Sequence, residues 1–293
     1  MKNGTSAGGE RELEEAYERC RIAATTHYEN FPVGSILAPR HLRRYVHAVY
    51  AFARGADDIA DEGHHSSAER LRKLDEWQTQ LDLCYQGTPS NPLFLALSDT
   101  IRQCTLPQKD FNDLLIAFRM DASFGGFERW EDLLYYSRHS ANPVGRLVLA
   151  IFGAASPETV RLSDKLCTAL QLTNFWQDLS VDSGRGRSYF PLEDCRRFGY
   201  TFDTPLPGRS SESFGKLLSY LIDRTERLYR ESEHLPGLVP RRLSLELRAT
   251  WNGGMVILGK VKKAGTDLLS HRPALDAGDK LRIIASALIG HHQ

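Results

Sequence analysis

Apolar residues recur every three to four positions along almost the whole chain, which is the spacing of amphipathic helices. The alternation of apolar and polar residues that marks strands, with a period of two between turn residues, is missing. The pattern therefore predicts an all-α fold. The expected helices span residues 10–29, 39–61, 67–85, 91–104, 107–123, 130–153, 157–181, 211–234 and 241–271.

The segments between the predicted helices are short and polar, or rich in proline and glycine, with one exception. Residues 182–209 form a long stretch rich in glycine, arginine and proline. Because loops of that length in compact domains are usually functional or disordered, and because this one follows an acidic helix end, we expect a functional loop. The simplest organisation is a flexible N-terminus over residues 1–9 and a single helical domain over residues 10–293.

Composition excludes several classes of protein. The 37 basic residues balance 37 acidic ones, so the chain lacks the electrostatic footprint of a nucleic-acid-binding protein. The five cysteines show no C-x-x-C spacing, which indicates a reduced, intracellular protein without a zinc site. No apolar run approaches the roughly 20 residues that span a bilayer. We expect a cytoplasmic protein, soluble or peripheral to the inner membrane.

A first acidic segment lies near the end of the second predicted helix. Asp57 and Asp61 are four residues apart, so both carboxylates fall on one stripe of that helix. Tyr50 and Arg54 lie on the same stripe. The segment therefore places carboxylates and a guanidinium on one helical face.

A second acidic segment repeats the arrangement. Asn174, Asp178 and Asp182 follow one another in four-residue steps, so one helical stripe again collects oxygen ligands. Arg185 and Arg187 come directly afterwards among glycines, and arginines on such a stretch can bind a phosphate through bidentate hydrogen bonds. The ordinary alternative is that both arginines solvate an exposed turn.

The two acidic stripes together indicate a bound cation, because like charges four residues apart on a helix repel each other. Oxygen ligands without histidine or cysteine suit magnesium, which takes one or two protein carboxylates and completes its shell with water and phosphate oxygens. Either stripe taken alone is better interpreted as a solvated helix face. The pair predicts magnesium bound together with a diphosphate.

These residues resemble the squalene and phytoene synthase family, in which two D-x-x-x-D motifs lie on facing helices of an all-α isoprenoid synthase fold with a central cavity. The resemblance runs from about residue 27 to the C-terminal helix and includes residues 50–54, 135–145 and 187–191. It implies a single isoprenoid synthase domain, and two or three magnesium ions bound with the diphosphate.

Within that family, residues 27–35, 140–146 and 174–178 are similar to the hydroxysqualene synthase branch. Gln177 stands where many relatives carry arginine, and Asn142 followed by proline replaces a pair of small residues. The resemblance implies loss of diphosphate from presqualene diphosphate, rearrangement of the cation and capture by water to give hydroxysqualene, without NADPH. It further implies a presqualene diphosphate synthase as partner. Because the substrate is largely hydrophobic, a peripheral membrane contact is also expected.

The resemblance also implies roles for individual residues. Predicted catalytic residues are Tyr50, Tyr136, Asn142 and Gln177. Predicted metal ligands are Asp57, Asp61, Asn174, Asp178 and Asp182. Predicted substrate-binding residues are Phe31, Arg54, Arg187 and Tyr189. Asn142, Asn174, Gln177 and His139 are unranked candidates for positioning water, and the other aromatic residues, Phe175 among them, are expected to be ordinary core.

Three alternatives stay open or are set aside. A head-to-head prenyl transferase that makes squalene, dehydrosqualene or phytoene would carry the same motifs. A non-catalytic lipid-binding or assembly factor would not need all four motif aspartates. Residues 254–261 come close to a phosphate-binding P-loop, but Val261 stands where a serine or threonine is required, so this segment is predicted to be a packed helix.

Overall fold

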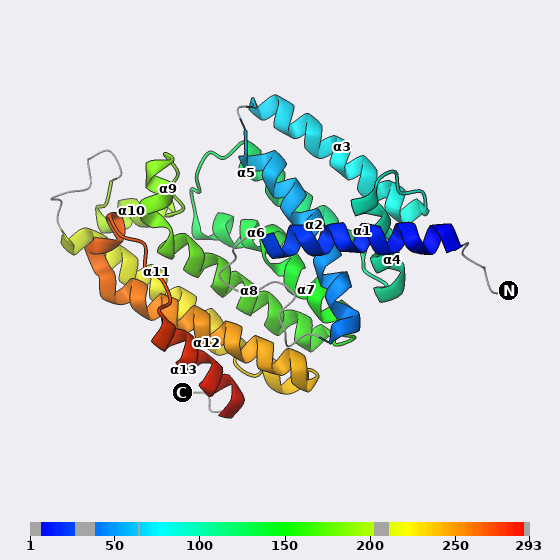
Figure 1. The fold of residues 1–293 in the computed structure, drawn as a ribbon. Coiled ribbons are helices and arrows are strands. Elements are labelled where there is room, and N and C mark those ends of the chain that lie inside the picture. Colours follow the sequence, from blue (N-terminus) through cyan, green and yellow to red (C-terminus); the bar gives the residue numbers. More distant parts are fainter. Residues whose placement is uncertain (1–6, 27–38, 64, 202–210, 290–293) are drawn as a thin grey trace. The chain divides into compact units, whose positions relative to one another are not determined.

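The structure is a computed structural model and describes residues 7–26, 39–63, 65–201 and 211–289. Every regular element in these ranges is an α-helix or a short 3₁₀ helix (Figure 1), which confirms the predicted all-α fold. Phe31, a predicted substrate-binding residue, lies outside the described residues. The helices form two compact units, Met1–Phe124 with Pro143–Ser156 and Gly125–Asn142 with Pro157–Gln293. The organisation as one isoprenoid synthase domain stays a prediction.

The first unit carries the first acidic segment. Its helices are α1 (Ala7–Thr26), α2 (Arg40–Asp61), α3 (Ser67–Gln86), α4 (Pro92–Cys104), α5 (Gln108–Ala122) and most of α7 (Asn142–Ile151). Local signals explain several of the helix ends. Ser66 and Glu69 form a capping box at the start of α3, and Gly87 adopts a left-handed φ of 80° at its end.

An aromatic core fixes the middle of α2. The ring of Phe52, which is fully buried, lies edge-on to Phe111 and Phe94 with centroid distances of 5.2 and 6.2 Å. Gly55 allows a close approach to Trp77, because a Cβ atom at this position would lie 2.7 Å from the indole ring. The helix that bears Asp57 is therefore packed against α3, α4 and α5.

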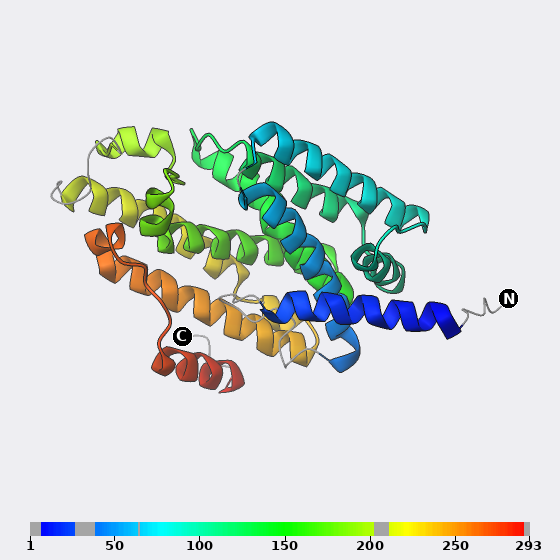
Figure 2. The same ribbon diagram turned by 45° about the horizontal axis from the view of Figure 1, so that its top comes forward.

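The second unit carries the second acidic segment. Its elements are α6 (Trp130–Ser140), α8 (Pro157–Gln177), α9 (Leu179–Gly184), α10 (Leu192–Phe198), α11 (Ser211–Ser232), η1 (Leu235–Leu238), α12 (Arg241–Ala264), η2 (Gly265–Leu269) and α13 (Ala277–Ile289). Helices α8, α11 and α12 run side by side, and α13 lies along α12 (Figures 1 and 2).

A buried polar contact joins α8 to α11, beside α12. The hydroxyl of Tyr229 on α11 lies 3.0 Å from the hydroxyl of Thr173 on α8, and both side chains are buried. Gly254 on α12 makes room for this tyrosine, since a Cβ atom there would lie 2.1 Å from the Tyr229 hydroxyl oxygen. Residues 254–261 lie inside α12, which confirms that they are helix packing.

Ion pairs anchor the start of α13. The carboxylates of Asp276 and Asp279 accept hydrogen bonds from each other's backbone N–H groups, at 2.8 and 3.1 Å. The Lys260 ammonium lies 2.5 Å from Asp279, and the Arg282 guanidinium contacts the same carboxylate at 2.5 Å. The Lys260 hydrogen bond, supported by the backbone N–H of Asp276 and by Arg282, holds the pKa of Asp279 well below its usual range.

This depressed pKa predicts a pH-dependent contribution to stability. Because the folded-state pKa is lowered, the stabilisation is present above the ordinary aspartate pKa of about 4 and is lost as the pH falls towards the folded value. Asp279→Asn is expected to lower the Tm at pH 7. The difference in Tm between this variant and the unmodified chain should shrink as the pH falls from about 5 to 2.5. Thermal unfolding across this range measures the effect, with Asp267→Asn as control; a difference independent of pH contradicts it.

Four predicted elements are wrong in detail. The expected helix 130–153 is two helices, because the chain turns at Ala141 and restarts with Pro143 in the first turn, where its missing N–H is not needed. The expected helix 157–181 ends at Gln177. The expected loop 182–209 contains the second half of α9 and all of α10. The expected helix 241–271 ends where Gly265 adopts a φ of 53°, and the separate α13 was not predicted.

Candidate functional site

The first acidic segment forms an ion-pair cluster at the end of α2. The Arg54 guanidinium lies 3.4 Å from Asp57, 2.5 Å from Asp58 and 2.8 Å from Glu62. Partial burial lowers the pKa of Arg54, but the three carboxylates raise it by more, so the guanidinium keeps its charge. Arg54, predicted to bind substrate, is thus held against carboxylates of its own helix.

Tyr50 and Asp61 lie on the same helix as this cluster. Tyr50 is half-buried one turn before Arg54, and Asp61 is exposed at the last position of α2. The four-residue steps predicted for this helix are confirmed, because α2 runs without a break from Arg40 to Asp61. The C-terminal end of α2 therefore presents a cluster rich in carboxylates.

The second acidic segment crosses the junction between α8 and α9. Asp178 lies between the two helices, with φ −92° and ψ 10°. The N–H of Asp178 donates to the Asn174 carbonyl at 2.8 Å, and the N–H of Asp182 donates to the Asp178 carbonyl at 2.9 Å. These bonds keep the three predicted ligands one helical turn apart although the helix is interrupted.

A segment that sequence reasoning missed covers this motif. Residues 270–276, here called the C-terminal strap, connect η2 to α13. The Arg272 guanidinium forms an ion pair with the Asp178 carboxylate, and the Pro273 carbonyl accepts a hydrogen bond from Gln177 Nε2 at 2.7 Å. Lys260 holds the strap from α12 through the Ala274 carbonyl at 3.1 Å. The only sequence signal was an arginine directly before a proline.

Gln177 is the most deeply buried of the predicted catalytic side chains, at 1% exposed. Its Nε2 is bonded to Pro273, which fixes the orientation of the amide, while its Oε1 is buried and has no hydrogen-bond partner among the described residues. An unsatisfied buried acceptor costs about 1–3 kcal/mol, so such a group calls for a donor that the protein itself does not provide. A bound water or substrate would supply one.

Two predicted residues meet in an aromatic cluster made of Phe127, Tyr136, Phe175 and Tyr189. Tyr189 stacks on Phe175 with ring centroids 3.9 Å apart and planes 10° apart. Tyr136 lies 5.8 Å from Phe175 and 5.7 Å from Phe127. Phe175, expected to be ordinary core, thus contacts two predicted site residues. Phe127, which follows two glycines, was missed because no helical pattern marks it.

The water-positioning candidates differ in their surroundings. Asn142 is buried, and its Oδ1 accepts a hydrogen bond from Thr168 at 3.0 Å. His139 is also buried, with Nδ1 2.8 Å from the Tyr135 carbonyl and its ring against the Tyr135 ring. His139 therefore has the contacts of an ordinary core histidine. Gln177 is the candidate with an open acceptor.

Arg187 follows the second motif closely. Its backbone N–H donates to the Asp182 carbonyl at 2.9 Å, after a turn at Gly186 with a φ of 70°. The side chain is half-buried, whereas Arg185 is exposed. The turn thus keeps Arg187 next to the last aspartate of the motif.

The donor set of each motif fits magnesium. In the described part of the chain no three His, Cys, Asp or Glu side chains come together as a metal site of their own. Magnesium does not require one, since it binds through one or two carboxylates and completes its shell with water and phosphate oxygens. One motif belongs to each unit, so their convergence on shared ions stays a prediction.

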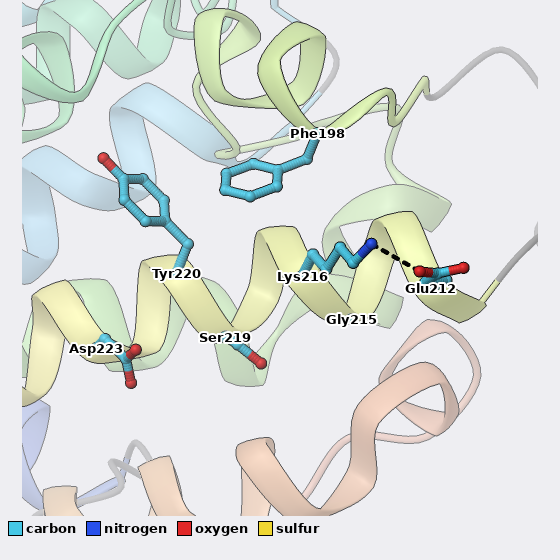
Figure 3. A pocket seen from close by; sticks show the side chains of 7 residues that line it. All are labelled: Phe198, Glu212, Gly215, Lys216, Ser219, Tyr220 and Asp223. Atoms are coloured by element: carbon cyan, nitrogen blue, oxygen red, sulfur yellow. Dashed lines mark hydrogen bonds and ion pairs between the residues drawn. The ribbon is translucent and has the colours of Figure 1, made fainter.

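A surface hollow of about 540 Å³ lies beside α10 and α11 (Figure 3). Phe198 and Tyr220 face each other there with ring centroids 5.3 Å apart, and a Lys216–Glu212 ion pair of 2.6 Å lies at one end. None of the predicted site residues lines it. The hollow is therefore separate from the acidic motif.

The fold and the two motifs define an isoprenoid-synthase type of enzyme, and comparison with known proteins agrees. The squalene/phytoene synthase model matches residues 24–279, and the chain belongs to this family. Phytoene synthase of Arthrospira platensis is 31% identical over 232 residues, which cover 75% of each chain. Phytoene synthase of Mycobacterium tuberculosis is 33% identical over 216 residues, which cover 74% of this chain and 70% of that one.

Two solved structures are also similar. Squalene synthase HpnC from Alicyclobacillus acidocaldarius has a TM-score of 0.82 and 41% identity, covering 87% of this chain and 96% of that one. A dehydrosqualene synthase in complex with a ligand has a TM-score of 0.82 and 25% identity, covering 96% and 98%. The chain is thus an enzyme of isoprenoid biosynthesis with the fold of these synthases.

Proposed function

We propose that this enzyme ionises presqualene diphosphate with magnesium and captures the rearranged cation with water, giving hydroxysqualene and diphosphate. The observation that carries the proposal is the buried Gln177, whose open Oε1 lies one residue before the acidic motif that would hold the leaving group. An amide oxygen in that position can accept a hydrogen bond from a water molecule and orient it. An arginine there could not.

The predicted site residues would take the following roles in the reaction. Asp57, Asp61, Asn174, Asp178 and Asp182 would hold two or three magnesium ions, which neutralise charge on the diphosphate. Arg54 and Arg187 would bind diphosphate oxygens through charge-assisted hydrogen bonds. The C–O bond to the diphosphate breaks with both electrons leaving on oxygen. Water then forms the new C–O bond, and the proton that it releases would pass to the departing diphosphate.

The aromatic cluster would shield the intermediate cation. Aromatic faces stabilise a desolvated cation by up to about 2 kcal/mol each, and Tyr136, Phe175 and Tyr189 provide adjacent rings. Such rings add no nucleophile, so the cation survives until it meets the positioned water. Asn142 and Asn174 are further candidates for holding that water.

A head-to-head prenyl transfer is the second candidate. It is favoured by the relatives above, which are named for squalene, dehydrosqualene and phytoene, and by the 41% identity to squalene synthase HpnC. Such an enzyme would condense two prenyl diphosphates. Under the first proposal, by contrast, an enzyme that makes presqualene diphosphate is the required partner.

One assay separates the two candidates. The purified chain is incubated with magnesium and either presqualene diphosphate or farnesyl diphosphate, with and without NADPH, and the lipid product is identified by mass spectrometry. We expect hydroxysqualene from presqualene diphosphate alone. Efficient condensation of farnesyl or geranylgeranyl diphosphate, or a requirement for NADPH, contradicts the proposal.

Gln177 offers a test of water capture. Gln177→Met keeps the side-chain volume but removes the Oε1 acceptor and the bond to Pro273. We expect the share of alcohol among the products to fall about tenfold or more in favour of hydrocarbons, because the cation then loses a proton instead of gaining water. Gas chromatography with mass detection gives the ratio. Gln171→Met on the same helix serves as control, and an unchanged ratio in Gln177→Met refutes the role.

A further inference from the structure

Helix α13 has apolar side chains on two faces. Ile283 and Ala287 are buried, and Ser286 on this side accepts a hydrogen bond from Asn252 of α12 at 3.3 Å. On the other side Leu281, Ile284, Leu288 and Ile289 are 70, 56, 68 and 69% exposed. In the described part of the chain, no other element has more than one large exposed apolar residue. The outer face of α13 is therefore an apolar patch.

Two basic side chains border this patch. With about 100° of turn per residue, Lys280 and Arg282 lie on either side of Leu281, so they border the apolar stripe along both edges. The Lys280 and Arg282 side chains are both exposed, whereas the Asp279 side chain is buried and contacts Lys260 and Arg282. The outer face of the described helix thus combines aliphatic side chains with two cations and no exposed carboxylate.

We propose that α13 is an interfacial helix that docks this protein onto the surface of an anionic phospholipid membrane. Helices with an apolar stripe bordered by lysine and arginine lie in the plane of the headgroups, where the aliphatic side chains are buried and the cations reach the phosphates. At 1.5 Å per residue the helix is about 20 Å long, too short to span the bilayer core. No helix in the described ranges is apolar and long enough for a span.

The charges favour a lipid surface over a second copy of this chain. In a two-fold symmetric dimer through this face, both copies would bring the same basic side chains and no exposed carboxylate of the helix to pair with them. Anionic headgroups can pair with Lys280, and with the exposed Arg282 in addition to its contact with Asp279. The anchoring of α13 by Lys260 and the Asp276–Asp279 cap holds the face outward in a fixed orientation. The proposal goes beyond the proposed reaction and does not depend on it.

Vesicle binding tests the proposal without any assay of activity. The full chain is centrifuged with vesicles of phosphatidylcholine and phosphatidylglycerol, and with phosphatidylcholine alone. We expect binding to the anionic vesicles that weakens as salt is raised. Leu281→Ser with Leu288→Ser should weaken it by about tenfold or more. Ile22→Ser with Leu238→Ser removes two exposed apolar residues elsewhere and should bind like the unmodified chain.

A charge variant and a measurement of Tm separate membrane docking from loss of folding. Lys280→Gln should reduce binding to anionic vesicles severalfold and leave binding to neutral vesicles unchanged. Because both leucines are exposed, the double variant should keep its Tm, which shows that lost binding is not lost folding. The proposal is overturned if the unmodified chain does not bind anionic vesicles, or if the double variant binds equally well. It is also overturned if sedimentation shows a dimer that the double variant abolishes.

Discussion

The Asp178→Asn variant is expected to lose at least a factor of about 100 in kcat while keeping its fold. Asparagine has the shape of aspartate but no charge, so it binds a hard divalent cation far less well. Fold retention follows from the position of the side chain, which is 30% exposed and makes a partly solvated pair with Arg272. Steady-state kinetics over a magnesium titration would show a lower kcat and a higher magnesium requirement.

Asp164→Asn provides the matched control for this variant. Asp164 lies on α8, 14 residues before Asp178 and about 21 Å from it along the axis, so the kcat and magnesium requirement of this variant should stay within about twofold of the unmodified chain. If Asp178→Asn retains near-normal turnover at the ordinary magnesium concentration, Asp178 is not a metal ligand. In that case the magnesium site would have to be assigned to other carboxylates.

Gly254→Ala is expected to destabilise the protein by about 3–5 kcal/mol, which combines overpacking with the loss of a buried hydrogen bond. The new methyl group would lie 2.1 Å from the Tyr229 hydroxyl oxygen and 2.9 Å from a Leu170 methyl group. Tyr229 is fully buried and bonded to Thr173, so it cannot move aside without breaking that bond. We expect the Tm to fall by about 10 °C.

The same helix offers a control for this substitution. A Cβ atom at Gly259 meets no heavy atom within 4 Å, so Gly259→Ala should leave stability unchanged or raise it by up to about 1 kcal/mol, as alanine favours the helix. Thermal and urea unfolding of both variants measure the difference. Equal stability of the two variants would mean that Tyr229 repacks freely, contrary to the contact described.

The long helices could be predicted from the sequence because a repeat of three to four residues leaves an unmistakable trace over several turns. The short ones could not. Helix α10 has only seven residues, too few to establish a period, although it starts after Pro191 and ends at Gly199 with a φ of 66°. The break at Asp178 has no sequence signal, because the hydrogen bonds from Asp178 and Asp182 preserve the helical spacing.

The residues of the candidate site that were predicted carry a local sequence pattern, and those that were missed do not. Candidate ligands that recur every fourth residue, such as Asn174 and Asp178, can be predicted from spacing alone. Contacts between distant segments do not, since Gln177 and Pro273 are 96 positions apart and no pattern links them. Arg272 was missed for this reason. Phe175 was predicted to be ordinary core, because an aromatic residue in the core and one that contacts the site recur with the same helical spacing.

The C-terminal strap limits how the length of this chain can vary. Arg272 is fixed to Asp178 at one end, and Lys260 grips Ala274 and Asp276 at the other. Inserting or deleting one residue between them would displace one of these anchors by about 3.8 Å, more than a hydrogen bond tolerates. Relatives that share these anchors of the C-terminal strap should therefore have the same number of residues between them, even where the amino acids themselves differ.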